Sequence, residues 1–297
     1  MRRAGLIGAI ALAGCGGGGG QPNATTATPA EAPGSAVAGA KVAVVVLENH
    51  GPDAVLRHGT WLGSPLRLSA RATNAYGEVH PSLGNYLAML SGANQGVEDD
   101  DVTHGPFDAP TIVGQLAAHH VAWRAYMDAM PAPCFGRTSD TDLTGDYAKR
   151  HNPFMFFTEV ISDPASCASH VVPGDRLAAD VRSGLPPFVW ITPNMCEDMH
   201  NCPVSAGDTW MRRTLPAVLR ALGPHGVLFV TADEGIDDAN GGGRIPLVAL
   251  GPGVQAGAVL ETRVDHRALL ATIEDLLGLG RLATTRNVPT LRDLLSQ

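Results

Sequence analysis

The chain has 297 residues, of which 44% are hydrophobic, and its formal net charge is -8 at pH 7. This length and hydrophobic content allow one sizeable core, and α/β enzymes of this size are often a single domain. The negative charge disfavours non-specific binding to nucleic acid, so no nucleic-acid partner is expected.

The N-terminal segment has the pattern of an exported protein. An apolar run, Ala4–Ala13, is too short to span a bilayer permanently, and Leu12–Cys15 resembles a bacterial lipoprotein box. We therefore predict a lipoprotein signal peptide over residues 1–14, a lipid on Cys15, and a flexible Gly/Pro/Ala/Thr tether over residues 15–40. An ordinary secretory signal with an incidental cysteine is the alternative. Both predict export, and the lipoprotein would be membrane-anchored in the cell envelope or periplasm of a bacterium.

The predicted folded domain, residues 41–297, begins with a strand that ends at two oxygen-bearing side chains. The run Ala43–Leu47 is rich in β-branched residues, as in a strand that is buried on both faces of a parallel sheet. Glu48 and Asn49 follow it. In an open α/β sheet the carboxyl ends of the strands line the crevice where ligands bind, so both side chains are candidate metal ligands.

The next motif, His80–Gly92, predicts a helix whose first turn suits an anion. Ser82 is a good N-cap, apolar residues recur at helical spacing after it, and Gly92 suits a C-cap. A helix start helps a hydroxyl group to ionise, and a Ser82 alkoxide held on a metal is a competent nucleophile for phosphorus. Asn85, one turn further on, could donate its amide to a phosphoryl oxygen. Taken alone, the motif favours a serine that only caps a helix.

Helical and strand patterns then alternate to the end of the chain. This alternation predicts a three-layer α/β/α sandwich with a mostly parallel central sheet. The predicted helices are Thr111–His120, Arg176–Ser183, Thr209–Leu222 and Asp265–Leu277. The predicted strands are Trp123–Met127, Pro187–Thr192, Leu228–Ala232 and Pro246–Leu250.

A second acidic pair follows the strand predicted over Leu228–Ala232. Asp233 and Glu234 stand after that strand as Glu48 and Asn49 stand after the first. If both strands end at the same edge of the sheet, four oxygen ligands could converge on one cation.

Four cysteines besides Cys15 form an even set, which allows three disulfide connectivities. In an oxidising compartment, Cys196–Cys202 is the economical pair, because it closes a short loop. Cys134–Cys167 would then tie the middle of the chain together. A zinc site made from these thiols is the weaker alternative, because the spacing lacks a C-x-x-C pair.

Six motifs in order resemble those of one known family. They are ENHGP, HPSLGNYLAMLSG, HNPFMFF, FVWITPNMCEDMHNC, VTADEG and DHRALLATIEDLLGL. This order is similar to the phosphoesterase family of bacterial acid phosphatases and C-type phospholipases, within the alkaline phosphatase superfamily. The resemblance runs from about Lys41 to the end of the chain, and it implies an alkaline-phosphatase-like fold.

The resemblance also implies roles for individual residues. The implied metal ligands are Glu48, Asn49, Ser82, Asp198, Asp233 and Glu234. The implied catalytic residues are Ser82, Asn85 and His200, and the implied substrate-binding residues are His80, Asn85, His151 and His200. One departure is Gly84, where the family usually has proline. Because glycine costs backbone entropy, we expect a looser first helical turn at Ser82.

The predicted function is metal-dependent hydrolysis of phosphate monoesters through a phosphoserine, as in acid phosphatases. A carboxylate-rich site with an asparagine suits calcium, magnesium, manganese, iron or zinc. The alternatives are a phosphodiesterase or phospholipase C that acts on phospholipid headgroups, and a surface lipoprotein without catalytic activity. The predicted partners are a small phosphate ester or phospholipid and, through the lipid anchor, a membrane.

Overall fold

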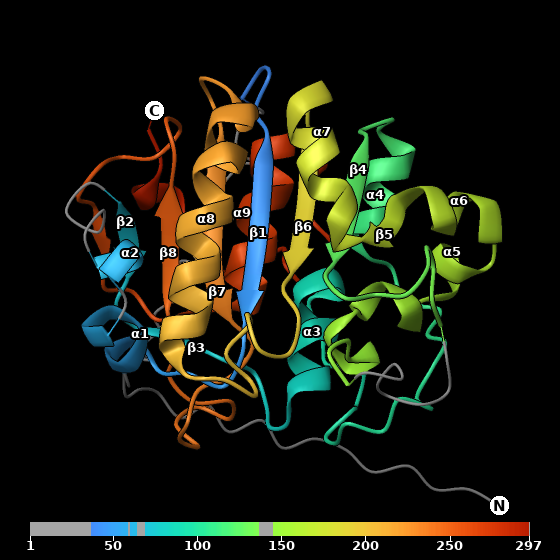
Figure 1. Ribbon diagram of the computed structural model, residues 1–297, viewed down its shortest axis with the longest axis horizontal. Coiled ribbons are helices and arrows are strands. Elements are labelled where there is room, and N and C mark those ends of the chain that lie inside the picture. The colour runs from blue at the N-terminus through green and yellow to red at the C-terminus, as the bar shows by residue number, and fades with distance from the viewer. Residues whose placement is uncertain (1–36, 59, 64–68, 137–144, 297) are drawn as a thin grey trace, which may run out of the picture. The chain divides into compact units, whose positions relative to one another are not determined.

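The central feature of the fold is a mostly parallel, eight-stranded sheet, shown in the computed structural model in Figure 1. The structure describes residues 37–58, 60–63, 69–136 and 145–296, so the predicted signal peptide, Cys15 and most of the tether lie outside the described residues. The strands of the sheet are, in spatial order, β5 (Val171–Pro173), β4 (Trp123–Met127), β6 (Phe188–Thr192), β1 (Val42–Leu47), β7 (Val227–Ala232), β8 (Leu247–Leu250), β2 (Ala70–Ala72) and β9 (Val259–Leu260).

Strand β1 lies in the middle of this sheet, between β6 and β7, and pairs in parallel with both. Every residue of β1 and of β7 is buried, as expected for β-branched strands that are covered on both faces. The register pairs Leu47 with Ala232. The residues that follow these two strands therefore lie next to each other at the carboxyl ends of the strands.

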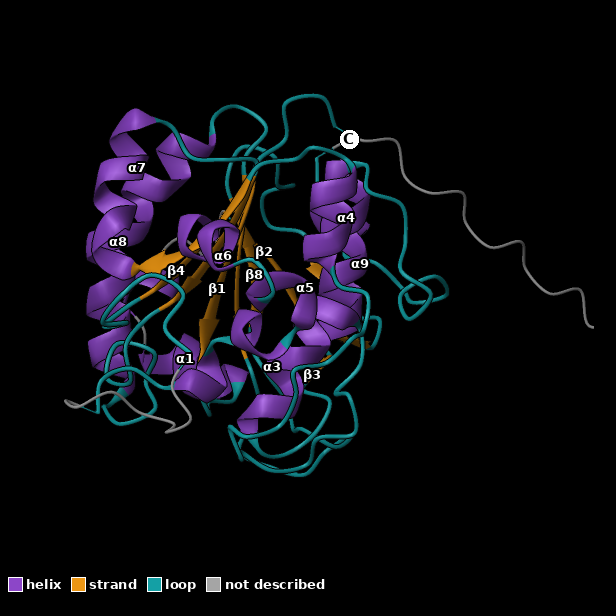
Figure 2. Cartoon of the chain, turned by 90° about the vertical axis from the view of Figure 1, so that its right-hand side faces the viewer, coloured by secondary structure: helices purple, strands orange, loops and turns teal. Residues whose placement is uncertain are grey.

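Helices cover both faces of the sheet, so the predicted three-layer α/β/α fold is confirmed. Figure 2 shows the strands between α7 and α8 on one side and α4 and α9 on the other. The helices are α1 (Pro52–His58), α2 (Thr60–Gly63), α3 (Ser82–Ser91), α4 (Ile112–Ala118), α5 (Thr158–Ile161), α6 (Pro164–His170), α7 (Leu177–Ser183), α8 (Val204–Leu222) and α9 (His266–Leu277).

Several short elements lie outside the main sheet and the longer helices. A two-stranded parallel sheet pairs β3 (Ala75–Tyr76) with β10 (Val264–Asp265). The 3₁₀ segments are η2 (Lys149–His151), η3 (Pro153–Phe156), η4 (Gly174–Arg176) and η5 (Arg292–Leu294). No helix within the described part of the chain combines the length and apolar character needed to cross a membrane.

The predicted strands agree with the observed ones to within a residue at each end, and β8 is the one that runs antiparallel to its neighbours β7 and β2. The predicted helix Thr209–Leu222 begins earlier, at Val204. The helical pattern in the sequence does not extend to Val204, because the first turn of α8 contains Gly207, a poor helix former. A Cβ on Gly207 would lie 2.4 Å from the Cε of Met199, so the glycine allows the loop before α8 to pack directly on the helix.

The prediction that Ser82 caps α3 is wrong. Pro81 is the N-cap residue, Ser82 is the first residue of the helix, and no side chain of the capping residue bonds to the helix amides. The amide of Leu83 instead donates to Oδ1 of Asp100, 2.9 Å away. The hydroxyl group of Ser82 is thereby left for another partner. At the other end, Gly92 adopts the left-handed conformation of a C-cap, as predicted.

Candidate active site

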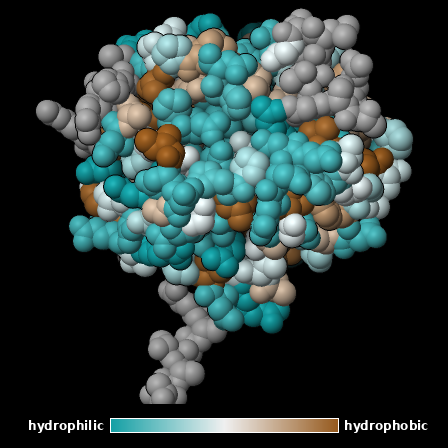
Figure 3. All heavy atoms as spheres, turned by 90° about the horizontal axis from the view of Figure 1, so that it is seen from below, coloured by the Kyte–Doolittle hydropathy of each residue, from teal (hydrophilic) through white to brown (hydrophobic). Residues whose placement is uncertain are grey.

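The candidate site lies at the carboxyl ends of β1, β6 and β7. Glu48 follows β1, Asp233 follows β7, and the loop after β6 carries Asp198 and His200. The backbone amide of Glu48 donates to the carbonyl oxygen of Asp198 over 2.8 Å, which ties the loop to β1. Figure 3 views the molecule from this end, and the side chains visible there are mostly hydrophilic.

Glu48 is the centre of the site and is fully buried. Its Oε1 accepts a hydrogen bond from the hydroxyl group of Tyr86 over 2.5 Å, and its Oε2 accepts one from Oγ of Ser82 over 3.2 Å. Burial, followed by the nearby charges of Asp233 and Asp198, raises the pKa of Glu48 well above its usual value. This carboxylate is therefore costly to ionise unless positive charge lies beside it.

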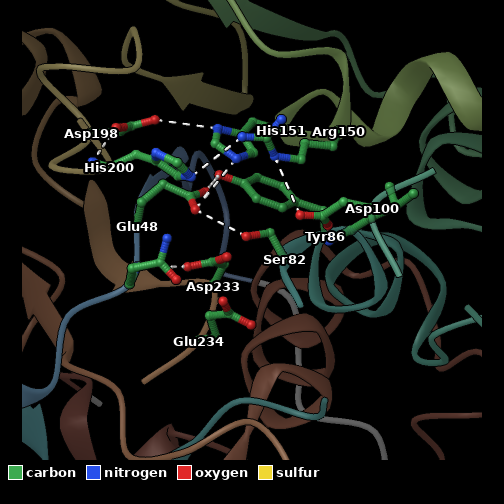
Figure 4. Close-up of polar contacts among 12 residues, drawn as sticks. Glu48, Ser82, Tyr86, Asp100, Arg150, His151, Asp198, His200, Asp233 and Glu234 are labelled. Atoms are coloured by element: carbon green, nitrogen blue, oxygen red, sulfur yellow. Dashed lines mark hydrogen bonds and ion pairs between the residues drawn. The ribbon is translucent and has the colours of Figure 1, made fainter. Parts of the chain in front are cut away.

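His151 lies between two of these carboxyl groups (Figure 4). Its Nε2 is 3.4 Å from Oε2 of Glu48, and its Nδ1 is 3.3 Å from Oδ2 of Asp198. Burial, together with the charge of Arg150, lowers the pKa of His151 to about 3, so the imidazole is neutral. A neutral imidazole has one N–H group, so one of its nitrogens points a lone pair at a carboxyl oxygen. Such a contact needs either a proton on that carboxyl group or a cation between the two.

The chemistry of these side chains fits a divalent cation. Glu48, His151 and His200 each offer one ligand atom, and these atoms lie within 4.8 Å of one another. Oδ2 of Asp198 and Oδ2 of Asp233 are buried and have no hydrogen-bond partner among the described residues. Burial raises the pKa of Asp198 to about 7. Carboxylate and imidazole ligands of this kind suit zinc, manganese and iron, and the carboxylates also suit calcium and magnesium.

Ser82 is placed to serve as the nucleophile. Its side chain is buried, and its hydroxyl group, at the first turn of α3, donates to Oε2 of Glu48. Asp100, which binds the next amide of α3, also pairs with Nε of Arg150 over 3.5 Å. Nη2 of Arg150 is 3.3 Å from Nε2 of His200. A guanidinium group and a helix start therefore supply positive charge close to the serine, as a phosphoryl group would require.

Two predicted residues contact their neighbours differently from expectation. The side-chain oxygen of Asn85 accepts from the amides of Glu78 and Val79, and its Nδ2 donates to the carbonyl of Val79, 2.8 Å away. Asn85 thus holds the turn before Ser82, and its contact with a phosphoryl oxygen stays a prediction. Asn49 contributes its backbone amide, which donates to Oδ1 of Asp233 over 3.1 Å. Metal binding by its side chain also stays a prediction.

His80 and Glu234 form a pair at the margin of the site. Nδ1 of His80 lies 2.8 Å from Oε2 of Glu234, and its Nε2 lies 2.9 Å from the carbonyl oxygen of Asp237. Burial and the charge of Asp233 raise the pKa of Glu234 to about 7. His80 is 30% exposed at its side chain, which makes it the more accessible of the two. The predicted roles of His80 in substrate binding and of Glu234 in metal binding stay predictions.

Both predicted disulfides are present. Cys196–Cys202 closes the loop that holds Asp198 and His200. Cys134–Cys167 links the loop after β4 to α6. The amide of His200 donates to Oδ1 of Asp198 over 2.8 Å inside the closed loop. The covalent link therefore restrains two candidate site residues together.

Sequence reasoning missed two residues of the site, Tyr86 and Asp100. Tyr86 stands four positions after Ser82, and side chains at that spacing share one face of a helix, so the spacing could have identified it. Asp100 gave no such signal, because it lies in a loop beyond α3 and only the folded chain brings it to the start of that helix. Arg150, in η2, directly precedes His151, which was predicted as a site residue.

Comparisons with known proteins show which family the chain resembles. Residues 72–280 match the Phosphoesterase family. Over 259 residues the chain is 29% identical to the phosphatidylinositol-3-phosphatase of Mycobacterium tuberculosis, covering 86% of this chain and 82% of that protein. Over 219 residues it is 26% identical to the phosphate-repressible acid phosphatase of Penicillium chrysogenum, covering 71% of this chain and 52% of that protein. The chain thus spans about half the length of this fungal relative.

Solved structures share the fold at low sequence identity. A protein of the alkaline phosphatase superfamily from Vibrio parahaemolyticus superposes with a TM-score of 0.59 at 12% identity, covering 88% of this chain and 71% of that one. Murine ectonucleotide pyrophosphatase / phosphodiesterase 5 gives a TM-score of 0.58 at 12% identity, covering 86% of this chain and 100% of that one. The chain belongs to the Phosphoesterase family and is a hydrolase of phosphoric esters, as its ordered motifs predicted.

Proposed function

We propose that the protein hydrolyses phosphate monoesters in a metal-dependent reaction that passes through a phosphoserine on Ser82. The observation that carries the proposal is the hydrogen bond from Ser82 to Glu48 within a buried cluster of carboxyl and imidazole groups. The relatives named as acid phosphatases support monoesters as the substrate class.

The protein's own residues supply most of the chemistry in this proposal. The hydroxyl proton of Ser82 can pass to Oε2 of Glu48, and the serine oxygen then bonds to phosphorus while the bond to the departing alcohol breaks. Arg150 and the start of α3 stabilise the phosphoryl oxygens, and water protonates the departing alcohol. Water then hydrolyses the phosphoserine and releases phosphate.

A divalent cation, when bound, would lower the pKa of the serine hydroxyl and offset the negative charge of the carboxyl groups. The residues that would hold it are Glu48, Asp198, Asp233, His151 and His200. This assignment differs from the sequence prediction, which gave His151 to substrate binding and His200 to catalysis and substrate binding. It also leaves out three of the predicted ligands, Asn49, Ser82 and Glu234.

A phosphorylated lipid is the second candidate substrate, because a relative that aligns over most of the chain is named a phosphatidylinositol-3-phosphatase. The lipoprotein box would place the protein beside such a substrate, and we propose that Cys15 anchors the exported protein to a bacterial membrane. Two alternative functions, cleavage of phosphodiesters and ligand binding without catalysis, must be distinguished from monoester hydrolysis by experiment. The serine, carboxyl and imidazole groups of the cluster favour a catalytic protein over a binding protein.

The test compares wild type with Ser82→Ala on an aryl phosphate, a bis-aryl phosphate, phosphatidylinositol 3-phosphate and phosphatidylcholine. We expect the wild type to favour the monoester and to lose activity with a chelator. Ser82→Ala should lower kcat by about 10³-fold or more, since it removes the nucleophile. Ser91→Ala is the matched control, because Ser91 lies on the same helix and, among the described residues, its hydroxyl bonds to the carbonyls of Leu87 and Ala93 and to Gln95 and not to the site. Near wild-type turnover by Ser82→Ala would contradict the proposal.

A further inference from the structure

We infer that Tyr86 is a positioning residue that decides which oxygen of Glu48 faces the cation and the serine. This inference rests on the proposed function. It concerns a residue to which the sequence motifs assigned no role, and it assigns different tasks to the two oxygens of one carboxyl group.

The contacts of Glu48 divide cleanly between its two oxygens. Oε1 takes the hydroxyl group of Tyr86 at 2.5 Å. Oε2 receives the hydroxyl group of Ser82 at 3.2 Å and lies 3.4 Å from Nε2 of His151. Figure 4 shows Tyr86 and Ser82 reaching Glu48 from separate positions. With Oε1 bound to Tyr86, Oε2 is the oxygen directed at the reactive groups.

The position of the tyrosine hydroxyl is itself set by packing. Tyr86 is fully buried, and its ring stacks on the imidazole of His151, with 5.3 Å between the centroids and 11° between the planes. The ring of Trp190 lies 6.5 Å away at a tilt. Tyr86 also stands one helical turn after Ser82 on α3. One side chain therefore connects the candidate nucleophile's helix, the imidazole of His151 and the central carboxylate.

This arrangement has a consequence for the cation. A carboxylate that can rotate is able to present either oxygen to a metal, whereas a hydrogen bond to one oxygen fixes the rotation and favours binding through the other. Partners that orient a ligand in this way typically raise metal affinity about 10- to 100-fold. We therefore expect loss of the tyrosine hydroxyl to weaken metal binding while leaving the packed ring in place.

The experiment compares Tyr86→Phe with Tyr126→Phe in the full chain. Tyr126 is the matched control, because it is also fully buried and its hydroxyl also donates to a carboxylate, Asp180, over 2.8 Å. The chelator-treated proteins are titrated with Mn²⁺, Zn²⁺, Ca²⁺ and Mg²⁺, each alone, by calorimetry. The signal of bound Mn²⁺ in electron paramagnetic resonance reports the coordination directly.

We expect Tyr86→Phe to bind the cations about 10- to 100-fold more weakly and to change the Mn²⁺ signal, and Tyr126→Phe to match wild type in both. Replacement of Tyr86 by 4-aminophenylalanine, which keeps the ring and a donor, should restore most of the affinity. If Tyr86→Phe does not fold, this replacement carries the test, and a large loss of affinity despite the retained donor would overturn the inference.

Wild-type affinity and an unchanged Mn²⁺ signal in Tyr86→Phe would overturn this inference alone. A wild-type protein that binds none of the four cations would overturn both this inference and the metal-dependent function. The two failures are therefore distinguishable from the wild-type titration.

Discussion

Three carboxyl groups, Glu48, Asp198 and Asp233, are fully buried beside one another at the candidate site. Burial of one isolated carboxylate is costly, and mutual repulsion among three adds to that cost. The pKa values of Glu48 and Asp198 are raised for this reason, because without a cation each carboxylate is neutralised most easily by binding a proton. A site that binds protons in this way is suited to exchange them for a metal ion.

We predict that the metal-free protein becomes more stable as the pH falls from about 8 to about 6. The pKa of Asp198 is about 7 in the folded protein and near 4 in the unfolded chain, so over this interval the folded state binds more protons. Stability is therefore lost as pH rises through 7, by about 1 kcal/mol for Asp198 alone. The measurement is the Tm of chelator-treated protein across this pH range.

The Asp198→Asn variant is the control for that measurement, because it removes one of the two carboxyl groups with a pKa of about 7 and should reduce the pH dependence, while Glu234 keeps its share. A saturating divalent cation should raise Tm and also flatten the curve, since the metal replaces the protons. If the Tm of the metal-free wild type decreased steadily from pH 8 to pH 6, the assignment of raised pKa values at this site would be wrong.

At the scale of single elements, helix α3 shows how neighbouring segments determine the position of Ser82, the candidate nucleophile. Gly84 was expected to loosen the first turn, because glycine costs backbone entropy. In the structure Gly84 is a point of close approach, since a Cβ there would lie 2.6 Å from Cγ2 of Val79 and 2.8 Å from the carbonyl oxygen of Val97. The glycine allows the segments on either side of α3 to pack tightly against the turn that carries Ser82.

We predict that Gly84→Ala destabilises the protein, although helix propensity alone would favour alanine by about 1 kcal/mol. The added methyl group must displace a backbone carbonyl, and overpacking of this kind typically costs about 1 to 3 kcal/mol. Chemical denaturation measures the effect as a lower midpoint with an unchanged slope.

Gly114→Ala in α4 is the comparison for this substitution. A Cβ at Gly114 would meet the carboxylate of Glu159, the far end of a side chain that can move, so a smaller loss is expected. An increase in stability for Gly84→Ala would show that the packing around α3 is looser than described.

At the scale of the whole molecule, the order of the strands brings the site together. Strand β1 lies between β6 and β7, so the chain segments that follow these three strands meet at one edge although they are far apart in sequence. Helix α3, which lies on the face with α4 and α9, adds Ser82 and Tyr86 to that edge. All of these residues lie after β1 begins at Val42.

We therefore predict that the N-terminal segment contributes location and not catalysis. A chain that begins at residue 37 should keep the kcat/KM of the full-length protein on a soluble aryl phosphate. Cys15→Ser should release the full-length protein from the membranes of a bacterium that processes lipoproteins, as measured by fractionation. Unchanged membrane retention of Cys15→Ser would contradict the proposed anchor, and a large loss of kcat/KM in the shortened chain would contradict the separation of roles.

The sequence by itself determined the elements with strong local patterns and the candidate residues that directly follow them. The β-branched runs predicted β1 and β7, and the acidic side chains at their ends predicted Glu48 and Asp233 as neighbours, because parallel strands end at one edge. The compartment implied by the N-terminus and the spacing of the cysteines predicted both disulfides. These inferences depend on the periodicity of apolar residues, on residue propensities and on short spacings along the chain, all of which can be read directly from the sequence.

Only the tertiary structure decided how the side chains share their contacts. It gave the amide of Leu83 to Asp100 and left Ser82 to bond with Glu48. It also directed Asn85 to the preceding turn, and it brought Tyr86 and Arg150 to the site. The physical reason is that each buried polar group needs a partner, and in a folded chain the partner comes from whichever segment lies nearest in space. That distance is set by the packing of the whole domain, so no local pattern records it.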